Sequence, residues 1–137
     1  MPDITDHPAT APGAVTGAPR ALLRLEGLAL GIAALVGYGW TGASWLMFAV
    51  LFLAPDLSFL GYLAGPRVGA IAYNAAHVTL APIALGIAGA TLPSPLALQL
   101  ALIWLAHIGI DRAFGYGLKY TEGFSLTHLG RIGKTPA

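Results

Sequence analysis

The sequence predicts an all-α integral membrane protein, a bundle of four transmembrane helices with both termini in the cytoplasm. Three observations support this prediction: the composition, four long apolar stretches, and basic residues confined to one side. Of the 137 residues, 56% are hydrophobic and 9% are charged, and the mean hydropathy is +0.72. Because a soluble domain carries about 25% charged residues, this chain has too little charge to cover a water-facing surface.

The same composition excludes several classes of function. Seven Lys and Arg against six Asp and Glu give no basic face for nucleic acid. The absence of cysteine excludes disulfide scaffolds, thiolate metal ligands and cysteine nucleophiles. Phosphate-binding loops, dinucleotide-binding glycine patterns and the common hydrolase motifs do not occur in the sequence. We therefore expect the lipid bilayer as the main partner and no nucleic acid.

The predicted elements follow one another from a tail to a cap. Residues 1–20 contain four Pro and no apolar periodicity, which is typical of a disordered tail. Each of the next four stretches has about the 17–25 residues that a membrane-spanning helix needs. Their approximate limits are 21–38, 43–63, 68–90 and 95–114. The expected domains are thus the tail, a transmembrane domain over 21–114, and a polar, glycine-rich C-terminal cap over 115–137.

The basic residues predict the orientation in the membrane. All seven lie on one side of a four-span arrangement, near the two chain ends and between the second and third spans. The positive-inside rule places that side in the cytoplasm, together with both termini. Trp40 and Trp45 then lie at the opposite interface, where aromatic residues are enriched.

Five ionisable side chains lie inside the predicted spans: Glu26, Asp56, His77, His107 and Asp111. A charged side chain at the centre of a span costs about 2.5–3.5 kcal/mol, so these groups need partners. With a rise of about 1.5 Å per residue, all five fall within the cytoplasmic half of the bilayer. His107 and Asp111 also share one helix face, because their spacing is i, i+4.

Imidazole and carboxylate groups are ligands of Zn, Fe and Mn, and helical bundles hold metals in this way. We therefore predict a divalent metal, Zn, Fe or Mn, with Asp56, His77 and His107 as ligands. Asp111 is expected as a further ligand or as the group that orients His107. If the site is catalytic, metal-activated water acts on a lipid-like or amphipathic substrate, and Glu26 and Asp111 assist, Glu26 as general base.

Three further residues are candidates for binding the substrate. Asn74 shares a helix face with His77, and Arg67 and Arg112 lie near the cytoplasmic interface, where they would hold an anionic headgroup. Two other interpretations stay open. In the first, the polar set only locks helix packing in a structural or interaction subunit. In the second, it belongs to a small proton-coupled carrier, although the other half of the spans lacks polar groups. The many small residues also allow a homodimer.

The chain resembles the family of small bacterial membrane proteins catalogued as domain of unknown function 4260. The resemblance covers about residues 21–134 and lies in four blocks, RLEGLAL (24–30), APDLSFLGYLAGPRVGAIAYNAAH (54–77), WLAHIGIDRAFGYGLKY (104–120) and THLGRIGK (127–134). It implies a multi-pass protein of the bacterial inner membrane and no established activity. The His-x3-Asp spacing of the fourth span is also similar to that of small membrane-bound metal-dependent hydrolases, which is an analogy of spacing alone.

Overall fold

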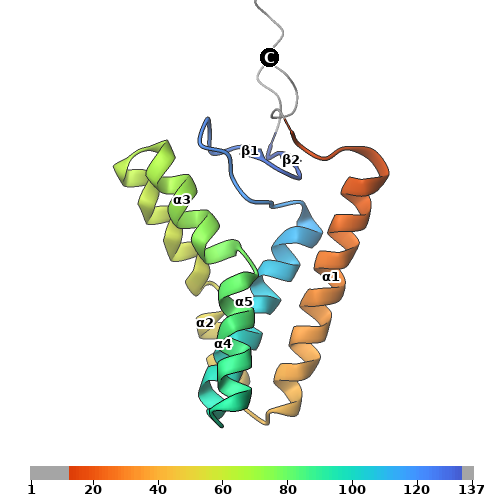
Figure 1. Ribbon diagram of the computed structural model, residues 1–137, viewed down its shortest axis with the longest axis vertical. Coiled ribbons are helices and arrows are strands. Elements are labelled where there is room, and N and C mark those ends of the chain that lie inside the picture. The colour runs from red at the N-terminus through yellow and green to blue at the C-terminus, as the bar shows by residue number, and fades with distance from the viewer. Residues whose placement is uncertain (1–12, 134–137) are drawn as a thin grey trace, which may run out of the picture.

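A computed structural model describes residues 13–133 of the chain (Figure 1). These residues form six helices, one of them a 3-10 helix, and one short hairpin. The elements are α1 (Gly17–Trp40), α2 (Trp45–Leu51), η1 (Ala54–Ala64), α3 (Pro66–His77), α4 (Leu80–Thr91), α5 (Pro95–Phe114), β1 (Leu126–Thr127) and β2 (Gly130–Arg131). Four stretches are long and apolar enough to cross a membrane, as predicted: Gly17–Trp40, Trp45–Ala64, Pro66–Thr91 and Pro95–Phe114.

The first and fourth spans are continuous helices. α1 begins at Gly17, so the last four residues of the expected tail belong to the helix, which corrects that boundary. Arg20 explains the difference, because its side chain donates to the carbonyl of Leu129 and ties this first turn to the C-terminal segment. α5 has the predicted limits: Ser94 caps its start, and Gly115 ends it in a left-handed conformation at φ +88°. The rest of the expected tail, residues 1–12, lies outside the described residues.

The second and third spans are each divided into two helical parts, which the sequence analysis did not predict. The second is divided at residues 52–53, where α2 gives way to η1, and the third at Val78, whose ψ of 140° is extended. Pro55 accounts for the first break, because it removes a helical N–H and disfavours the α conformation just before it. Hydropathy does not reveal such breaks, since both halves of each span are apolar.

Glycine residues let α1 and α5 approach until their backbones touch. A Cβ atom on Gly109 of α5 would lie 2.4 Å from the backbone nitrogen of Gly31 on α1. A Cβ atom on Gly27 would lie 3.1 Å from the carbonyl oxygen of Gly109. On another side of α5, a Cβ atom on Gly89 of α4 would lie 2.6 Å from the nitrogen of Leu98. Small residues at such positions are the usual basis of helix association in membranes.

η1 and α3 pack against each other as a helical hairpin that diverges from α1 (Figure 1). Here too the packing depends on glycine, since a Cβ atom on Gly69 would lie 2.2 Å from the ring of Tyr62. The C-terminal segment lies across this end of the bundle, between α3 and the start of α1 (Figure 1). Its Thr127 and Leu129 are fully buried, and the N–H of Val15 donates to the carbonyl of His128.

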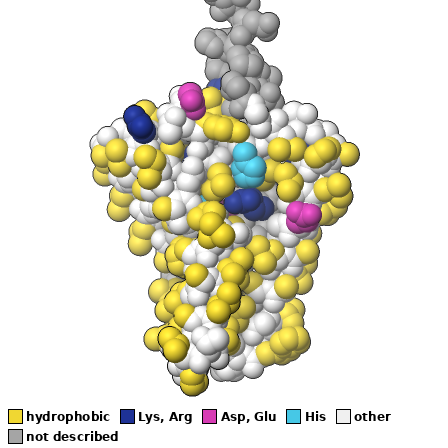
Figure 2. Space-filling model, in the orientation of Figure 1, with side chains coloured by type: hydrophobic (Ala, Val, Ile, Leu, Met, Phe, Trp, Pro, Cys, Tyr) yellow, Lys and Arg dark blue, Asp and Glu magenta, His cyan; other side chains and the backbone are white. Residues whose placement is uncertain are grey.

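Charged and apolar side chains occupy different ends of the molecule. On the face drawn in Figure 2, the Lys, Arg, Asp, Glu and His side chains all lie in the half that carries the C-terminal segment. The sequence explains this, because residues 27–55 and 78–106 contain no Asp, Glu, His, Lys or Arg. Large apolar side chains are exposed along the helices, with Leu57 68% and Leu80 72% exposed. Such a surface suits lipid, and the side of the membrane on which each end lies stays a prediction.

Candidate metal centre

Four ionisable side chains meet between η1, α3 and α5. They are Asp56, His77, His107 and Asp111, and one ligand atom from each lies within 4.8 Å of all the others. The two histidines are almost fully buried, with relative exposures of 2% and 1%. The carboxylate side chains are 34% and 21% exposed, so the cluster is reached from the side of its two acids.

The two helix breaks place these residues. Asp56 lies in the first turn of η1, directly after the break in the second span. His77 is the last residue of α3, directly before the break in the third span. The start of η1 and the end of α3 therefore lie at the same place, beside α5. A carboxylate near a helix N-terminus is also a position that the helix dipole favours.

Five of the six separations between the four atoms are nearly uniform. Nε2 of His77 lies 3.3 Å from Oδ1 of Asp56 and 3.5 Å from Oδ2 of Asp111. Nε2 of His107 lies 3.3 Å and 3.2 Å from the same two oxygens, and the two nitrogens are 3.1 Å apart. Ligand atoms at about 2.0–2.1 Å around a tetrahedral ion are about 3.3–3.4 Å apart. Neighbouring ligands of an octahedral ion are about 3 Å apart, so the set also fits that geometry with the two carboxylates opposite each other.

With both rings neutral and both acids ionised, ring protons do not satisfy this arrangement. Nδ1 of His77 lies 2.8 Å from the carbonyl oxygen of Tyr73 and donates to it, so in the neutral ring Nε2 carries a lone pair toward the cluster. Nε2 of His107 can supply one proton at most, while two carboxylates and the imidazole of His77 all accept. If both rings were protonated instead, two cations would face each other at 3.1 Å. Without a metal, a carboxylate or the His77 ring must take up an extra proton, whereas a single cation bound by all four atoms pairs them without one.

Aromatic rings hold the two imidazoles in place. The ring of Tyr73 is stacked on that of His77, with centroids 3.8 Å apart and planes 11° apart. The ring of Phe52 meets His107 at 5.3 Å and 65°. Because each imidazole is packed against a ring and buried in the bundle, its Nε2 has little freedom to leave the cluster.

Side chains of α5 satisfy the backbone at the break in the third span. The indole N–H of Trp104 donates to the carbonyl of Ala76 at 2.6 Å, and Arg112 donates to the carbonyl of His77 at 3.2 Å. Carbonyl groups at the end of a helix lack partners within it, and in a bilayer no water replaces them. α5 therefore contributes two cluster residues and also stabilises the irregular backbone that presents a third.

Of the residues predicted to bind metal, the structure brings Asp56, His77 and His107 together. Asp111 joins them as a fourth member, and its Oδ2 faces the same Nε2 of His107 that points into the cluster. To orient His107 as predicted, Asp111 would have to accept a hydrogen bond from Nδ1, the ring nitrogen that points away from the cluster. Nδ1 of His107 has no hydrogen-bond partner among residues 13–133. The geometry therefore favours Asp111 as a ligand.

Glu26, the predicted general base, is not part of the cluster. It lies on an exposed face of α1, and within residues 13–133 it forms no hydrogen bond or ion pair. The neighbouring Gly27 faces α5, and successive residues of a helix differ in direction by about 100°. The sequence analysis thus predicted how far Glu26 lies along the span, but it did not predict which face of α1 carries its side chain.

The three residues predicted to bind substrate have different surroundings. Asn74 uses its side-chain amide on the backbone of Lys119, donating to the carbonyl at 2.8 Å and accepting from the N–H at 2.7 Å. It therefore ties α3 to the C-terminal segment. Arg67 is exposed at the start of α3, outside the cluster. Arg112 lies beside the cluster, where it donates to the backbone of His77.

A cavity of about 280 Å³ lies on the acid side of the cluster. Asp56 and Asp111 line it together with Lys119 and aromatic residues of η1, α3 and the C-terminal segment. Lys119 is only 4% exposed, and its ammonium group lies 3.9 Å from the centroid of the Phe124 ring. Burial lowers the pKa of Lys119 to about 8. The sequence analysis gave Lys119 and Trp104 no role at the site. For Trp104 a signal was available, because a residue three positions before His107 lies on the same helix face as that histidine.

Together these features define a helical protein with four stretches able to span a membrane and a buried histidine–aspartate cluster at two helix breaks. The chain belongs to the family described as Domain of unknown function (DUF4260), whose sequence model matches residues 20–132. This membership confirms the resemblance seen in the sequence. No curated protein and no solved structure matches the chain significantly.

Proposed function

We propose that the protein binds one divalent transition-metal ion in the membrane, with Asp56, His77, His107 and Asp111 as ligands. The observation that supports this most strongly is the set of five separations of 3.1–3.5 Å between four convergent ligand atoms. Two carboxylates with two neutral imidazoles balance the charge of a divalent ion. The ligand types suit Zn, Fe and Mn.

We further propose that the bound ion serves hydrolysis of an amphipathic, lipid-like substrate. A divalent ion can bring the pKa of a bound water to about 7 and can polarise a substrate carbonyl. Access is consistent with this role, because both acids line the 280 Å³ cavity while both histidines are buried behind them. The position of Glu26 gives no support to its predicted role as general base.

Elemental analysis of the purified full-length protein tests metal binding. The protein is purified in mild detergent with a tag that lacks histidine and without chelator. We expect about one Zn, Fe or Mn per chain, and we expect His77→Ala and His107→Ala to lose it. His128→Ala is the matched control, because His128 lies in the C-terminal segment, where its Nδ1 accepts from the N–H of Leu118. A folded wild-type protein without metal, or variants that keep it, would contradict the proposal.

A structural role for the cluster makes a different prediction. Replacing a buried polar pair by apolar residues is often neutral, whereas removing one partner alone is costly. A subunit that uses the cluster only for packing should tolerate His107→Leu combined with Asp111→Leu. For a metalloprotein, the double variant loses the metal and every effect of metal on stability. Thermal unfolding with and without added metal separates the two cases.

We also propose that both chain ends lie in the cytoplasm of a bacterial cell, on the basis of the seven basic residues. The absence of native cysteine makes the test simple. Single cysteines are introduced at Gly42, in the loop after α1, and at Ser125, in the C-terminal segment. A membrane-impermeant thiol reagent added to intact spheroplasts should label only the first. Labelling of the second alone would reverse the orientation.

A further inference from the structure

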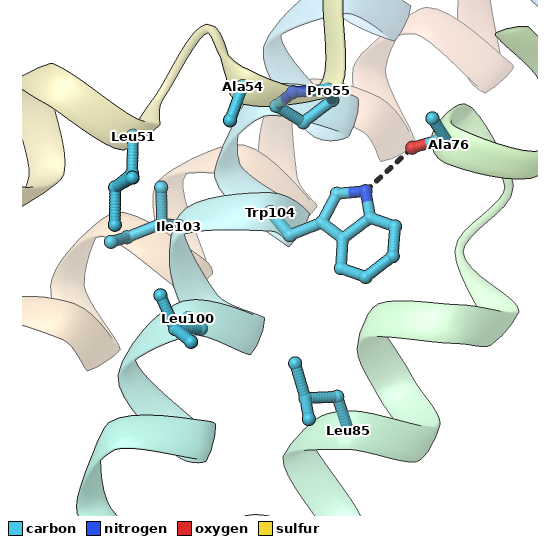
Figure 3. A pocket seen from close by; sticks show the side chains of 8 residues that line it. All are labelled: Leu51, Ala54, Pro55, Ala76, Leu85, Leu100, Ile103 and Trp104. Atoms are coloured by element: carbon cyan, nitrogen blue, oxygen red, sulfur yellow. Dashed lines mark hydrogen bonds between the residues drawn. The ribbon is translucent and has the colours of Figure 1, made fainter. Parts of the chain in front are cut away.

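A second cavity, of about 390 Å³, lies among α2, η1, α3, α4 and α5 (Figure 3). None of the eight described residues that line it is charged: Leu51, Ala54, Pro55, Ala76, Leu85, Leu100, Ile103 and Trp104. The polar atom of the tryptophan is already used, since its indole N–H donates to the carbonyl of Ala76 (Figure 3). The cavity therefore offers its occupant an almost wholly apolar wall.

The lining residues are the chain neighbours of the cluster. Pro55 precedes Asp56, Ala76 precedes His77, and Ile103 lies one helical turn before His107. Asp56 itself lines the 280 Å³ cavity that also holds Lys119. The surroundings thus change from apolar to polar at the cluster, which is the pattern that an amphipathic molecule requires.

The apolar spans that line this cavity indicate what fills it. Residues of α2, η1, α3, α4 and α5 line it. These elements make up the second, third and fourth stretches that are able to span a membrane. Beside it, large side chains face outward from the same helices, with Val50 68% and Ile83 44% exposed. Hydrocarbon chains are the medium in contact with such a surface in a bilayer. The volume also lies within the range of about 300–1,000 Å³ typical of ligand pockets.

We propose that this cavity binds the alkyl chain of a membrane amphiphile whose polar head lies at the histidine–aspartate cluster. The placement of the head rests on the proposed metal centre, whereas binding of the chain does not. The substrate class is therefore a long-chain lipid or fatty-acid derivative. The chain enters from the bilayer, and the head meets the cluster at the side of Asp56.

Quenching of tryptophan fluorescence tests the chain site. The protein has three tryptophans, so Trp40→Phe with Trp45→Phe leaves Trp104 as the only one. The probe is a single-chain fatty acid brominated on its chain, titrated into the protein in mild detergent. We expect quenching of Trp104 that saturates and is reversed by an excess of the same fatty acid without bromine. Quenching that rises without saturation and resists competition would overturn the inference.

A pair of matched variants sharpens this test. Leu85→Phe with Leu100→Phe fills the cavity from α4 and α5, and we expect binding of the probe to weaken at least fivefold. Ile87→Phe with Leu96→Phe also replaces two aliphatic residues of the same helices by Phe, at exposed positions outside the cavity, and should leave binding unchanged. Equal binding in both double variants would contradict the proposed site. The saturation and competition measurements on the parent protein do not depend on these variants.

Measuring the metal content of the same samples separates the two proposals. Saturable, competed quenching in a protein that holds no metal supports the chain site and contradicts the metal centre. A stoichiometric metal together with quenching that does not saturate supports the metal centre and overturns the chain site.

Discussion

Two faces of α5 have opposite characters. On one face, α5 meets α1, a continuous helix, and glycines let the two backbones touch. On the other face, it meets the start of η1, which carries Asp56, and the end of α3, which carries His77. The first contact involves no ionisable group of the cluster. The second brings all four members of the cluster together, and each of the two cavities that flank the cluster is partly lined by α5.

The difference shows how a small helical bundle can hold an irregular site. The contact of α1 with α5 depends only on close packing of regular helices, which satisfy their own backbone groups. The site needs interrupted helices, and side chains of α5 such as Trp104 and Arg112 satisfy the carbonyls that the break in α3 leaves without partners. One helix thus carries both a close-packed face and the face that holds the histidine–aspartate cluster.

The largest effect is expected on the packing face. Gly109→Val should destabilise the protein by about 3 kcal/mol, because the new side chain meets backbone atoms that cannot move aside. Titration with sodium dodecyl sulfate in mild detergent measures the loss. Gly86→Ala is the control, since its Cβ atom would lie at an ordinary 3.4 Å from Ala101. Equal stability of the two variants would mean that α1 and α5 do not pack as described.

Metal removal should produce the next effect, on the site face. A ligand at a hundredfold excess over its dissociation constant stabilises a protein by about 2.7 kcal/mol. We expect a chelator to lower the free energy of unfolding by about that amount, and Zn or Mn to restore it. His107→Ala should show no response to either addition. If neither the chelator nor added metal changes the free energy of unfolding of the wild-type protein, the assignment of a metal to this face of α5 is contradicted.

The connection between α3 and the C-terminal segment gives a smaller effect. Asn74→Ala removes two hydrogen bonds to the backbone of Lys119, worth about 2 kcal/mol together. Hydrogen exchange at the amide of Lys119 should therefore accelerate by about thirtyfold, since 1.4 kcal/mol corresponds to about a factor of ten. Asn74→Asp keeps the acceptor for that amide, so its exchange rate should lie between those of the wild type and Asn74→Ala. Unchanged exchange would show that other contacts hold the segment.

The smallest effect concerns pH. The pKa of Lys119 in the folded protein is about 8, against an ordinary value of 10.5, so between these values the unfolded chain binds more protons. Stability therefore rises with pH in that window, by about 1 kcal/mol between pH 7.5 and 9. Unfolding of the metal-free protein at both pH values measures the rise. Lys119→Met should remove it, and a rise that survives this substitution comes from another group.

The sequence predicted the number of spans because hydropathy and length depend only on composition. It also predicted that Asp56, His77, His107 and Asp111 lie at one depth, which the convergence of their side chains supports. It did not predict the direction of Glu26 around α1, because depth along a helix does not determine which face meets a neighbour. Gly27, one residue away, was the better guide to that face, since close helix contacts select glycine.

The helix breaks were also beyond what the apolar pattern reveals. Pro55 was the available signal for the first, and its effect on the preceding residues is local. Pro82 is the comparable signal for the second, because it has no N–H for the carbonyl of Val78, four residues before it. The indole of Trp104 and the guanidinium of Arg112, which satisfy the carbonyls freed at this break, come from a distant part of the chain. Such partners become visible only in three dimensions.

X-ray absorption spectroscopy of the metal-loaded protein tests the central claim most directly. We expect two imidazole nitrogens and two carboxylate oxygens in the coordination shell, at about 2.0–2.2 Å for Zn. In His107→Gln, the scattering characteristic of imidazole should fall by half in any metal that is retained. A shell of oxygen atoms alone, without imidazole scattering, would place the metal elsewhere and contradict the assignment of this cluster.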